Sequence, residues 1–189
     1  MTVILHALLL EIPEKLETER LTLVATRAGL GAAVNEGVLE SFGELRAWMP
    51  WAQQAQSLDD SEKHCREAQA KWHSREMIDF CFFAKPRGPF VGKGGLHTID
   101  WSIPKFEVGY WIRSSCARRG YATEATGALV ELARAKLGAR RVEITCNALN
   151  APSRRVAEKS GFLLEGILRA SRRDNAGELA DSCMYARIF

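Results

Sequence analysis

The spacing of apolar residues divides the chain into short strands and a few helices. Residues 20–25 alternate polar and apolar side chains, as a half-buried strand requires. Residues 78–112 contain three short apolar runs separated by turn residues at 86–89 and at Pro104, a pattern that indicates an antiparallel meander. Further strands are expected at residues 141–146, 162–168 and 182–188.

Helical signals lie between these strands. Residues 28–45 have a weak helical periodicity that ends before Pro50, because proline disfavours helical backbone at the residue preceding it. Ser57 resembles a capped helix start, a strong amphipathic helix follows Gly120, and Asn150 can cap a further short helix. The order of elements predicts a mixed α/β sheet with a unit of strand, glycine turn, helix and strand in its second half.

Length and composition are those of one folded domain, which we assign to residues 1–189. Of the 189 residues, 47% are hydrophobic and 26% are charged, values that argue against a disordered, collagen-like or repeat-array chain. The net charge of +3 gives only weak attraction of the whole molecule to nucleic acid or anionic membranes. We therefore expect no nucleic-acid partner and no membrane partner, and any basic site has to be local.

The first residues and the cysteines bear on the location of the protein. Residues 1–10 are apolar but lack a basic leading region and are followed by Glu11 and Pro13, so neither a signal peptide nor a transmembrane helix is expected. Residues 1–16 are interpreted as a short, loosely packed extension of the domain. The five cysteines include no C-x-x-C pair, so we predict reduced thiols, a cytoplasmic location and no metal site.

The turn at Gly120 is the strongest candidate for binding chemistry. A strand that ends near Ile112 delivers the chain to this turn, and a helix begins directly after it. The first N–H groups of a helix have no internal partner and the helix dipole is positive there, so the turn can bind an anion such as a diphosphate. Gly120 allows close backbone approach, and Arg118 and Arg119 add two cations. The alternative is a tight turn with two solvated arginines.

Two common nucleotide-binding motifs do not occur in the chain. A Walker loop needs a Gly-Lys-Ser/Thr ending, and the Rossmann fingerprint needs three spaced glycines after the first strand. The Gly-Lys-Gly-Gly run at residues 92–95 has no helix behind it and is interpreted as a strand bulge or turn. The expected diphosphate therefore does not belong to an ordinary nucleoside triphosphate.

Two longer runs around these elements resemble one known family. Residues 107–112, EVGYWI, followed by residues 119–125, RGYATEA, resemble the central coenzyme A-binding motif of the GNAT superfamily of N-acetyltransferases. Residues 150–162, NAPSRRVAEKSGF, resemble the next motif of that superfamily, at a fitting distance along the chain. The runs ERLTL at 19–23, LRAWMPW at 45–51 and MYAR at 184–187 resemble the RimJ/RimL branch, the ribosomal-protein N-terminal acetyltransferases.

This resemblance implies a single GNAT-type domain, with a central mixed, mostly antiparallel twisted sheet flanked by helices. It implies acetyl-CoA as the acyl donor, with the diphosphate at the Gly120 turn and the pantetheine beside the preceding strand. The family usually has Gln or Arg at position 117, where this chain has Ala117, so main-chain groups have to supply most diphosphate contacts. The implied cofactor-binding residues are Trp111, Ile112, Arg118, Arg119, Gly120, Tyr121, Ala122, Thr123, Asn150 and Ser153.

The resemblance further implies direct transfer of the acetyl group to a primary amine. The amine must lose a proton before it attacks, and Glu107, on the same side of its strand as Gly109 and Trp111, is the candidate base. The alternative is a surface or amine-binding carboxylate. Ser153 is the candidate proton donor to the CoA thiolate, with plain helix capping as the alternative. Cys146 is expected to be a buried strand residue that forms no acyl intermediate.

Acceptor binding is assigned to Trp48, Trp51, His97 and Glu107, with both tryptophans on a loop where related enzymes shape the acceptor pocket. The favoured acceptor is the N-terminal amine of a protein, such as a ribosomal protein. One alternative is a small-molecule amine, including an amine antibiotic, or a bulkier donor such as succinyl-CoA. The other is a non-catalytic acyl-CoA-binding module. Apolar strand ends and the tryptophan loop also allow a homodimer.

Overall fold

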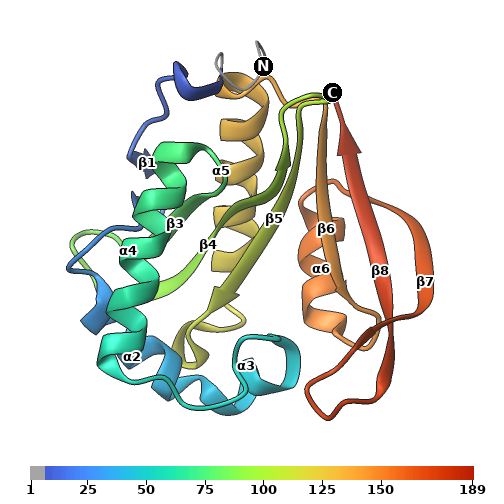
Figure 1. Ribbon diagram of the computed structural model, residues 1–189, viewed down its shortest axis with the longest axis horizontal. Helices are drawn as coiled ribbons and strands as arrows, with labels where there is room; N and C mark the ends of the chain where they lie inside the picture. Colours follow the sequence, from blue (N-terminus) through green and yellow to red (C-terminus); the bar gives the residue numbers. More distant parts are fainter. Residues whose placement is uncertain (1–6) are drawn as a thin grey trace.

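Within residues 7–189, which the computed structural model describes, eight strands form one open sheet (Figure 1). Their order is β1-β2-β3-β4-β5-β6-β8-β7, and neighbours are antiparallel except β5 and β6, which run parallel. The predicted mixed, mostly antiparallel sheet is confirmed. The strands are β1 (Lys15–Glu17), β2 (Leu21–Ala25), β3 (Ile78–Ala84), β4 (Phe90–Asp100), β5 (Lys105–Ile112), β6 (Arg141–Asn147), β7 (Leu163–Arg173) and β8 (Leu179–Ile188).

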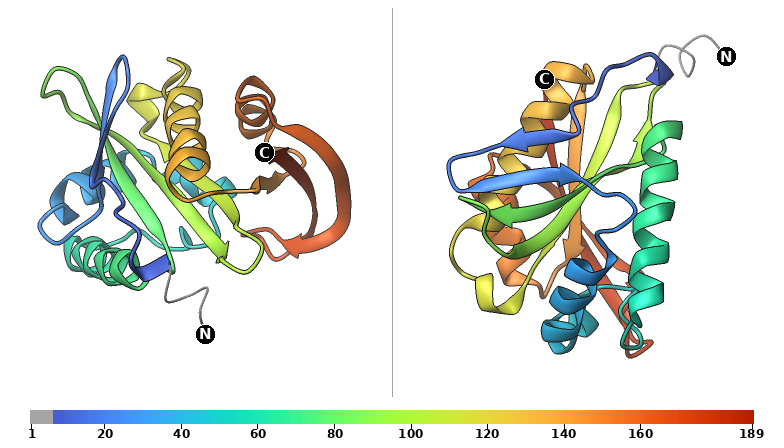
Figure 2. Two further views of the ribbon diagram at one scale, coloured as in Figure 1. Left: turned by 90° about the horizontal axis from the view of Figure 1, so that it is seen from above. Right: turned by 90° about the vertical axis from the view of Figure 1, so that its left-hand side faces the viewer.

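Helices cover both faces of this sheet. The helices are α2 (Gly31–Glu40), α3 (Phe42–Trp48), α4 (Leu58–Ser74), α5 (Tyr121–Lys136) and α6 (Ala151–Lys159). Helices α5 and α6 lie on one face, and α2 and α4 lie on the other (Figure 2). The larger core, between the sheet and α5, contains Phe106, Leu129 and Ile144. A smaller core under α2 and α4 contains Val38 and Trp111.

Local sequence signals account for the helix boundaries. Ser57 and Asp60 form the expected capping box at the start of α4, with Asp60 N–H donating to Ser57 Oγ at 3.1 Å. Helix α3 ends at Trp48 because Met49 is extended (φ −99°, ψ 116°) in front of Pro50. The prediction that both tryptophans lie on a loop is therefore wrong for Trp48, which ends the helix, whereas Trp51 lies in the following turn.

The glycine-rich run at residues 92–95 lies inside β4 and is not a turn. A register shift does accompany it, because Phe82 pairs with Gly92 whereas Phe83 pairs with Phe90. The glycines allow close strand contact, since a Cβ on Gly95 would come within 2.2 Å of the Ile78 carbonyl oxygen. The run therefore serves the packing of β4 between its two neighbouring strands.

The described part of the N-terminal segment packs on the domain. Ala7 and Ile12 are buried, and the Arg75 guanidinium donates to the Leu10 carbonyl at 2.7 Å. Strand β1, too short to show a period, was not expected and pairs with β2. Residues 1–6 of the predicted extension lie outside the described residues. Among residues 7–189, no helix combines the length and the apolar character that crossing a bilayer requires.

The two halves of the sheet part between β5 and β6. These strands pair only through Lys105–Glu107 and Arg141–Glu143. Beyond those residues β5 continues along β4 as far as Ile112, and β6 continues along β8 as far as Asn147. Figure 1 shows the two strands close together at one end and apart at the other. The separation leaves space within the sheet for a ligand.

Candidate functional site

A cavity of about 580 Å³ lies where β5 and β6 separate. It is lined by β4, β5, β6, the beginning of α6 and the loop after α3, and it reaches Arg172 on β7. The cavity brings together seven of the predicted site residues from four segments of the sequence. These are Trp48, Trp51, His97, Glu107, Trp111, Asn150 and Ser153.

The remaining predicted residues do not line this cavity and lie between β5 and α5. Ile112 ends β5 and packs partly buried against the larger core. A short 3₁₀ turn, Ser114–Cys116, leads to Gly120, whose φ of 83° is the left-handed conformation that glycine adopts without strain. The exposed Arg118 and Arg119 precede this turn, and Tyr121, Ala122 and Thr123 open α5.

The backbone of this turn is free to bind an anion. In the part of the chain that the structure describes, no N–H group from Arg118 to Thr123 donates to another protein group, whereas the N–H of Glu124 donates to the Gly120 carbonyl. The positive end of the helix dipole lies at the same place. This turn fits a diphosphate bound through main-chain donors. Such binding does not need the Gln or Arg side chain that the family usually has at position 117.

The chain that leads from β5 into the turn is fixed to α2. The Arg113 guanidinium forms ion pairs with Glu36, at 2.6 Å, and with Glu40. The N–H of Ser115 donates to Glu40 at 2.9 Å, and the N–H of Ser114 donates to Ser41 Oγ at 2.9 Å. Hydrogen bonds from Ser115 lead the causes that keep the pKa of Glu40 below its ordinary value. The acidic end of α2 therefore holds the entrance to the turn in place.

Glu107 and His97 lie side by side in the cavity wall. They are opposite each other in the β4–β5 register, and His97 Nδ1 lies 3.9 Å from Glu107 Oε2. The side chain of Glu107 is only 20% exposed. Gly109 leaves room for the imidazole, because a Cβ there would come within 2.6 Å of His97 Nε2. A carboxylate and an imidazole are thus available together at one end of the cavity.

Ser153 faces a tyrosine that sequence reasoning missed. The N–H of Ser153 donates to Asn150 Oδ1 at 3.1 Å, so the side chain that caps α6 is Asn150. Ser153 Oγ lies 3.1 Å from the Tyr110 hydroxyl. Burial raises the pKa of Tyr110 to about 12, against the smaller lowering effect of its hydrogen bond to Ser153. Tyr110 lies three positions from Glu107 on β5, so the two side chains leave the strand on opposite sides. The placement of α6 brings Ser153 to the Tyr110 side.

A buried polar cluster forms the wall below α4. Lys93 is 5% exposed and forms an ion pair with Asp79, and its Nζ lies 2.7 Å from His64 Nε2. Burial, followed by the charge of Lys93, lowers the pKa of His64, which favours a neutral ring that accepts from the ammonium. His64 is exposed as a whole residue, yet its ring Nε2 is engaged with Lys93. Sequence reasoning missed Lys93 because the glycines around it show no alternation of apolar and polar side chains, so the side of the strand that Lys93 occupies could not be predicted.

The family follows from comparison with known proteins. Residues 20–163 match the acetyltransferase (GNAT) domain family. The chain belongs to this family. The ribosomal-protein-serine acetyltransferase of Escherichia coli (strain K12) is 28% identical over 145 residues, which cover 77% of this chain and 79% of that protein.

Two solved structures show how this GNAT chain compares in three dimensions. RimL, a ribosomal L7/L12 alpha-N-protein acetyltransferase in complex with coenzyme A, has a TM-score of 0.85 at 25% identity, covering 94% of this chain and 97% of its own. The microcin C7 self-immunity acetyltransferase MccE, in complex with acetyl-CoA and AMP, has a TM-score of 0.85 at 19% identity. That match covers 91% of this chain and 94% of MccE and shows a shared fold.

This GNAT protein is an acetyl-CoA-dependent N-acetyltransferase, as its two central motifs implied. Its acyl donor is acetyl-CoA, in agreement with the CoA and acetyl-CoA bound in the similar structures. The predicted enzyme is therefore confirmed over the alternative of a non-catalytic binding module. Membership in the family leaves the acceptor and the individual residue roles to be derived from the site.

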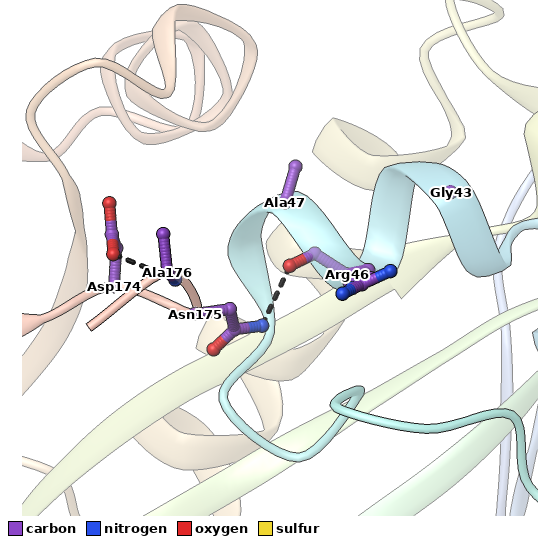
Figure 3. A pocket seen from close by; sticks show the side chains of 6 residues that line it. All are labelled: Gly43, Arg46, Ala47, Asp174, Asn175 and Ala176. Carbon is purple, nitrogen blue, oxygen red and sulfur yellow. Dashed lines mark hydrogen bonds between the residues drawn. The ribbon is translucent and has the colours of Figure 1, made fainter. Parts of the chain in front are cut away.

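One side chain joins the β7–β8 turn to the end of α3. Asn175, in the turn between β7 and β8, donates through Nδ2 to the carbonyl of Arg46 at 2.7 Å (Figure 3). The same Nδ2 donates to the carbonyl of Met49 at 2.8 Å. Its Oδ1 accepts from Gln53 at 2.9 Å. A second pocket of about 420 Å³ lies at this junction, between α3 and the β7–β8 turn. Asn175 thus holds the end of α3, which carries Trp48, and the turn after it, which carries Trp51.

We predict that Asn175→Ala lowers the free energy of unfolding by about 1–2 kcal/mol, because two carbonyls lose their donor. It should also raise the KM for the acceptor, since the tryptophan loop is released. Asn35→Ala is the matched control. Asn35 Nδ2 also donates to two carbonyls, those of Gln56 and Ser57, but neither belongs to α3 or to the turn that carries Trp51. Urea unfolding and steady-state kinetics of both variants test this. Equal acceptor KM values in both variants would contradict the role of Asn175.

Proposed function

We propose that this enzyme acetylates the N-terminal amine of a protein, of the ribosomal-protein type, by direct attack within a ternary complex. The observation that carries the proposal is the separation of β5 and β6. It creates one cavity that contains both candidate catalytic residues, Glu107 and Ser153, beside a turn with unpaired amides. The similarity to the ribosomal-protein-serine acetyltransferase supports the choice of acceptor.

In this proposal the main chain from Arg118 to Thr123 binds the donor's diphosphate, with the exposed Arg118 and Arg119 adding positive charge. The pantetheine runs beside Trp111 and Ile112 and reaches Asn150 and Ser153 on the other side of the gap. The support is positional, because Trp111, Asn150 and Ser153 line the cavity between the separated strands, and Ile112 follows Trp111 at the end of β5. A ligand there replaces the hydrogen bonds that β5 and β6 do not make to each other.

Glu107 is the proposed base. A primary amine is mostly protonated near neutral pH and cannot attack a thioester until it loses that proton. The carboxylate of Glu107 lines the cavity and is largely buried, so it can bind the ammonium group and then take its proton. His97, 3.9 Å away, can accept the proton in turn or orient the carboxylate. Their shared wall is the proposed binding place of the amine.

Ser153 and Tyr110 are proposed to serve the leaving group. When the amine nitrogen bonds to the acetyl carbon, the carbon–sulfur bond breaks and the CoA thiolate takes a proton. Ser153 Oγ can donate that proton and recover one from the Tyr110 hydroxyl at 3.1 Å. With a pKa of about 12, Tyr110 stays protonated at neutral pH. A backbone N–H near Trp111 is proposed to stabilise the carbonyl oxygen as it gains negative charge.

The state of Cys146 supports direct transfer. This cysteine lines the cavity near Ser153 and is the nearest candidate for an acyl-enzyme intermediate. Burial raises the pKa of its thiol, against the smaller lowering effect of Ser153, and a protonated thiol is a poor nucleophile. The amine is therefore proposed to attack the donor thioester itself.

Trp48 and Trp51 are proposed to shape the acceptor end. The ring of Trp51 lies 6.4 Å from that of Trp111 and stays 43% exposed at the cavity. An exposed aromatic wall beside Glu107 suits an acceptor that presents an amine with a short flanking segment. We place the reaction in the cytoplasm, where five buried thiols without a disulfide are typical.

A homodimer belongs to the same proposal. Strand β7 forms the sheet edge and exposes Leu163 (75%), Ile167 (49%) and Leu168 (48%), a density of apolar side chains typical of contact surfaces. We expect sedimentation equilibrium at micromolar concentration to give twice the chain mass of 21.1 kDa. Leu168→Lys should shift the mass towards the monomer. A monomer in the unchanged protein would exclude the dimer.

The acceptor is tested by mass spectrometry. The purified enzyme is incubated with acetyl-CoA, a set of peptides with free N-termini, matched N-terminally blocked peptides that retain lysine, and a panel of small amines. We expect addition of one acetyl group to free N-termini, because the cavity accommodates an amine with one flanking segment. Products from small amines alone would replace the proposed acceptor by a small molecule. No product from any amine would contradict the proposed reaction.

Glu107→Gln is expected to lower kcat by about 10²-fold, the usual contribution of a general base, with little change in the KM for acetyl-CoA. Glu143→Gln is the matched control, because Glu143 is the register neighbour of Glu107 on β6 and does not line the cavity. An unchanged kcat in Glu107→Gln would remove this residue from the mechanism.

A further inference from the structure

A cluster behind the Gly120 turn joins two parts of the sequence that the proposed chemistry does not connect. Thr18 and Arg20 lie between β1 and β2, and Glu124 lies in the first turn of α5. Thr18 Oγ1 donates to Glu124 Oε1 at 2.6 Å, and the backbone N–H of Arg20 donates to the same oxygen at 2.8 Å. Arg20 Nε donates to Glu124 Oε2 at 2.7 Å. One carboxylate therefore ties the β1–β2 connection to α5.

Arg20 also contacts the turn itself. Its Nη1 donates to the carbonyl of Arg119 at 2.9 Å, and its guanidinium carbon lies 4.9 Å from the centre of the Tyr121 ring. A Cβ on Gly120 would come within 3.3 Å of Arg20 Nη2, so the guanidinium lies directly against the turn. Arg20 thus bridges the turn and the helix that follows it.

The bond to Arg119 fixes the direction of a donor. In a trans peptide the carbonyl of one residue and the N–H of the next point in opposite directions. Because the Arg119 carbonyl points to Arg20, the N–H of Gly120 points away from Arg20. That N–H is one of the unpaired groups of the turn. Without the bond, rotation of this peptide could direct a carbonyl, rather than an N–H, towards the ligand.

Glu124 carries a negative charge beside a turn that is proposed to bind an anion, and this position needs an explanation. A carboxylate near an anion-binding turn repels the anion, so direct attraction to the ligand does not explain its place there. Burial acts to raise the pKa of Glu124, but hydrogen bonds from Thr18 and Arg20 outweigh it and hold the pKa below its ordinary value. The side chain is 15% exposed and remains ionised at neutral pH. Its contribution is therefore to hold Arg20 and the first turn of α5.

We propose that Thr18, Arg20 and Glu124 are positioning residues that keep the amides of the Gly120 turn directed at the donor's diphosphate. This inference rests on the proposed place of the diphosphate at that turn. The cluster links the ERLTL run, which begins directly after Thr18 and supplies Arg20, to the RGYATEA run, which supplies Glu124.

The test is the affinity for CoA, measured by isothermal titration calorimetry for the unchanged protein, Glu124→Gln and Arg20→Lys. Loss of the cluster should weaken CoA binding about tenfold in both variants. Repulsion alone predicts the opposite sign for Glu124→Gln, which removes a negative charge and would then bind CoA more tightly. Arg20→Lys keeps the positive charge but cannot donate to Glu124 and to the Arg119 carbonyl with the forked geometry of a guanidinium. It therefore distinguishes the effect of the hydrogen bonds from the effect of the charge.

A second donor and a control locate the effect. S-acetylpantetheine has no diphosphate, so the kcat/KM of both variants with this donor should equal that of the unchanged protein. Glu131→Gln removes a carboxylate from the same helix, where it pairs with Arg134, and should leave CoA affinity unchanged. Thermal unfolding of every variant reports its folding.

The outcomes separate this inference from the proposed function. Weaker CoA binding together with unchanged use of S-acetylpantetheine supports the positioning role. CoA binding in Glu124→Gln that equals or exceeds that of the unchanged protein overturns it, while the proposed function stands. Equal losses with both donors show a general structural role and also overturn it. An unchanged protein that does not bind CoA overturns the proposed function and this inference together.

Discussion

The parallel contact between β5 and β6 holds for only three residues, and this limit organises the rest of the molecule. Strands that stayed paired would satisfy each other's backbone groups and leave no space in the sheet. Here each strand continues along a different neighbour, β5 along β4 and β6 along β8. The facing edges therefore retain free backbone groups, and a ligand can take the place of the missing partner. The cavity, α6 and the loop after α3 all border this separation.

The two sides of the site use different physical means. At the Gly120 turn, unpaired amides and a helix dipole provide positive potential without depending on one side chain. Such an arrangement is compatible with Ala117 in place of the family's usual Gln or Arg. In the cavity, by contrast, individual side chains matter: Glu107 beside His97 and Ser153 beside Tyr110. In the proposed reaction, side-chain chemistry therefore lies in the cavity and main-chain binding of the donor lies at the turn.

Much of the structure could be predicted from local patterns. The capping box at Ser57, the extended Met49 before Pro50 and the capping by Asn150 depend on neighbouring residues alone, and each was found as expected. Strand β1 was missed because three residues cannot show a period. Lys93 and Tyr110 were missed because their partners, His64 and Ser153, come from other elements. Asn175 was missed for the same reason, since its partners lie more than 120 positions earlier in the chain.

The sequence by itself determined the element order, the glycine turn before α5 and the family, because these depend on spacing and residue type within short windows. Only the tertiary structure decided which side chains share the cavity. It also decided that Asn175 joins the β7–β8 turn to the end of α3 and that Arg20 and Glu124 meet behind the Gly120 turn. The physical reason is that hydrogen bonds and ion pairs act over a few ångströms in space. Their partners are set by the register of the sheet and the placement of the helices, which no local pattern encodes.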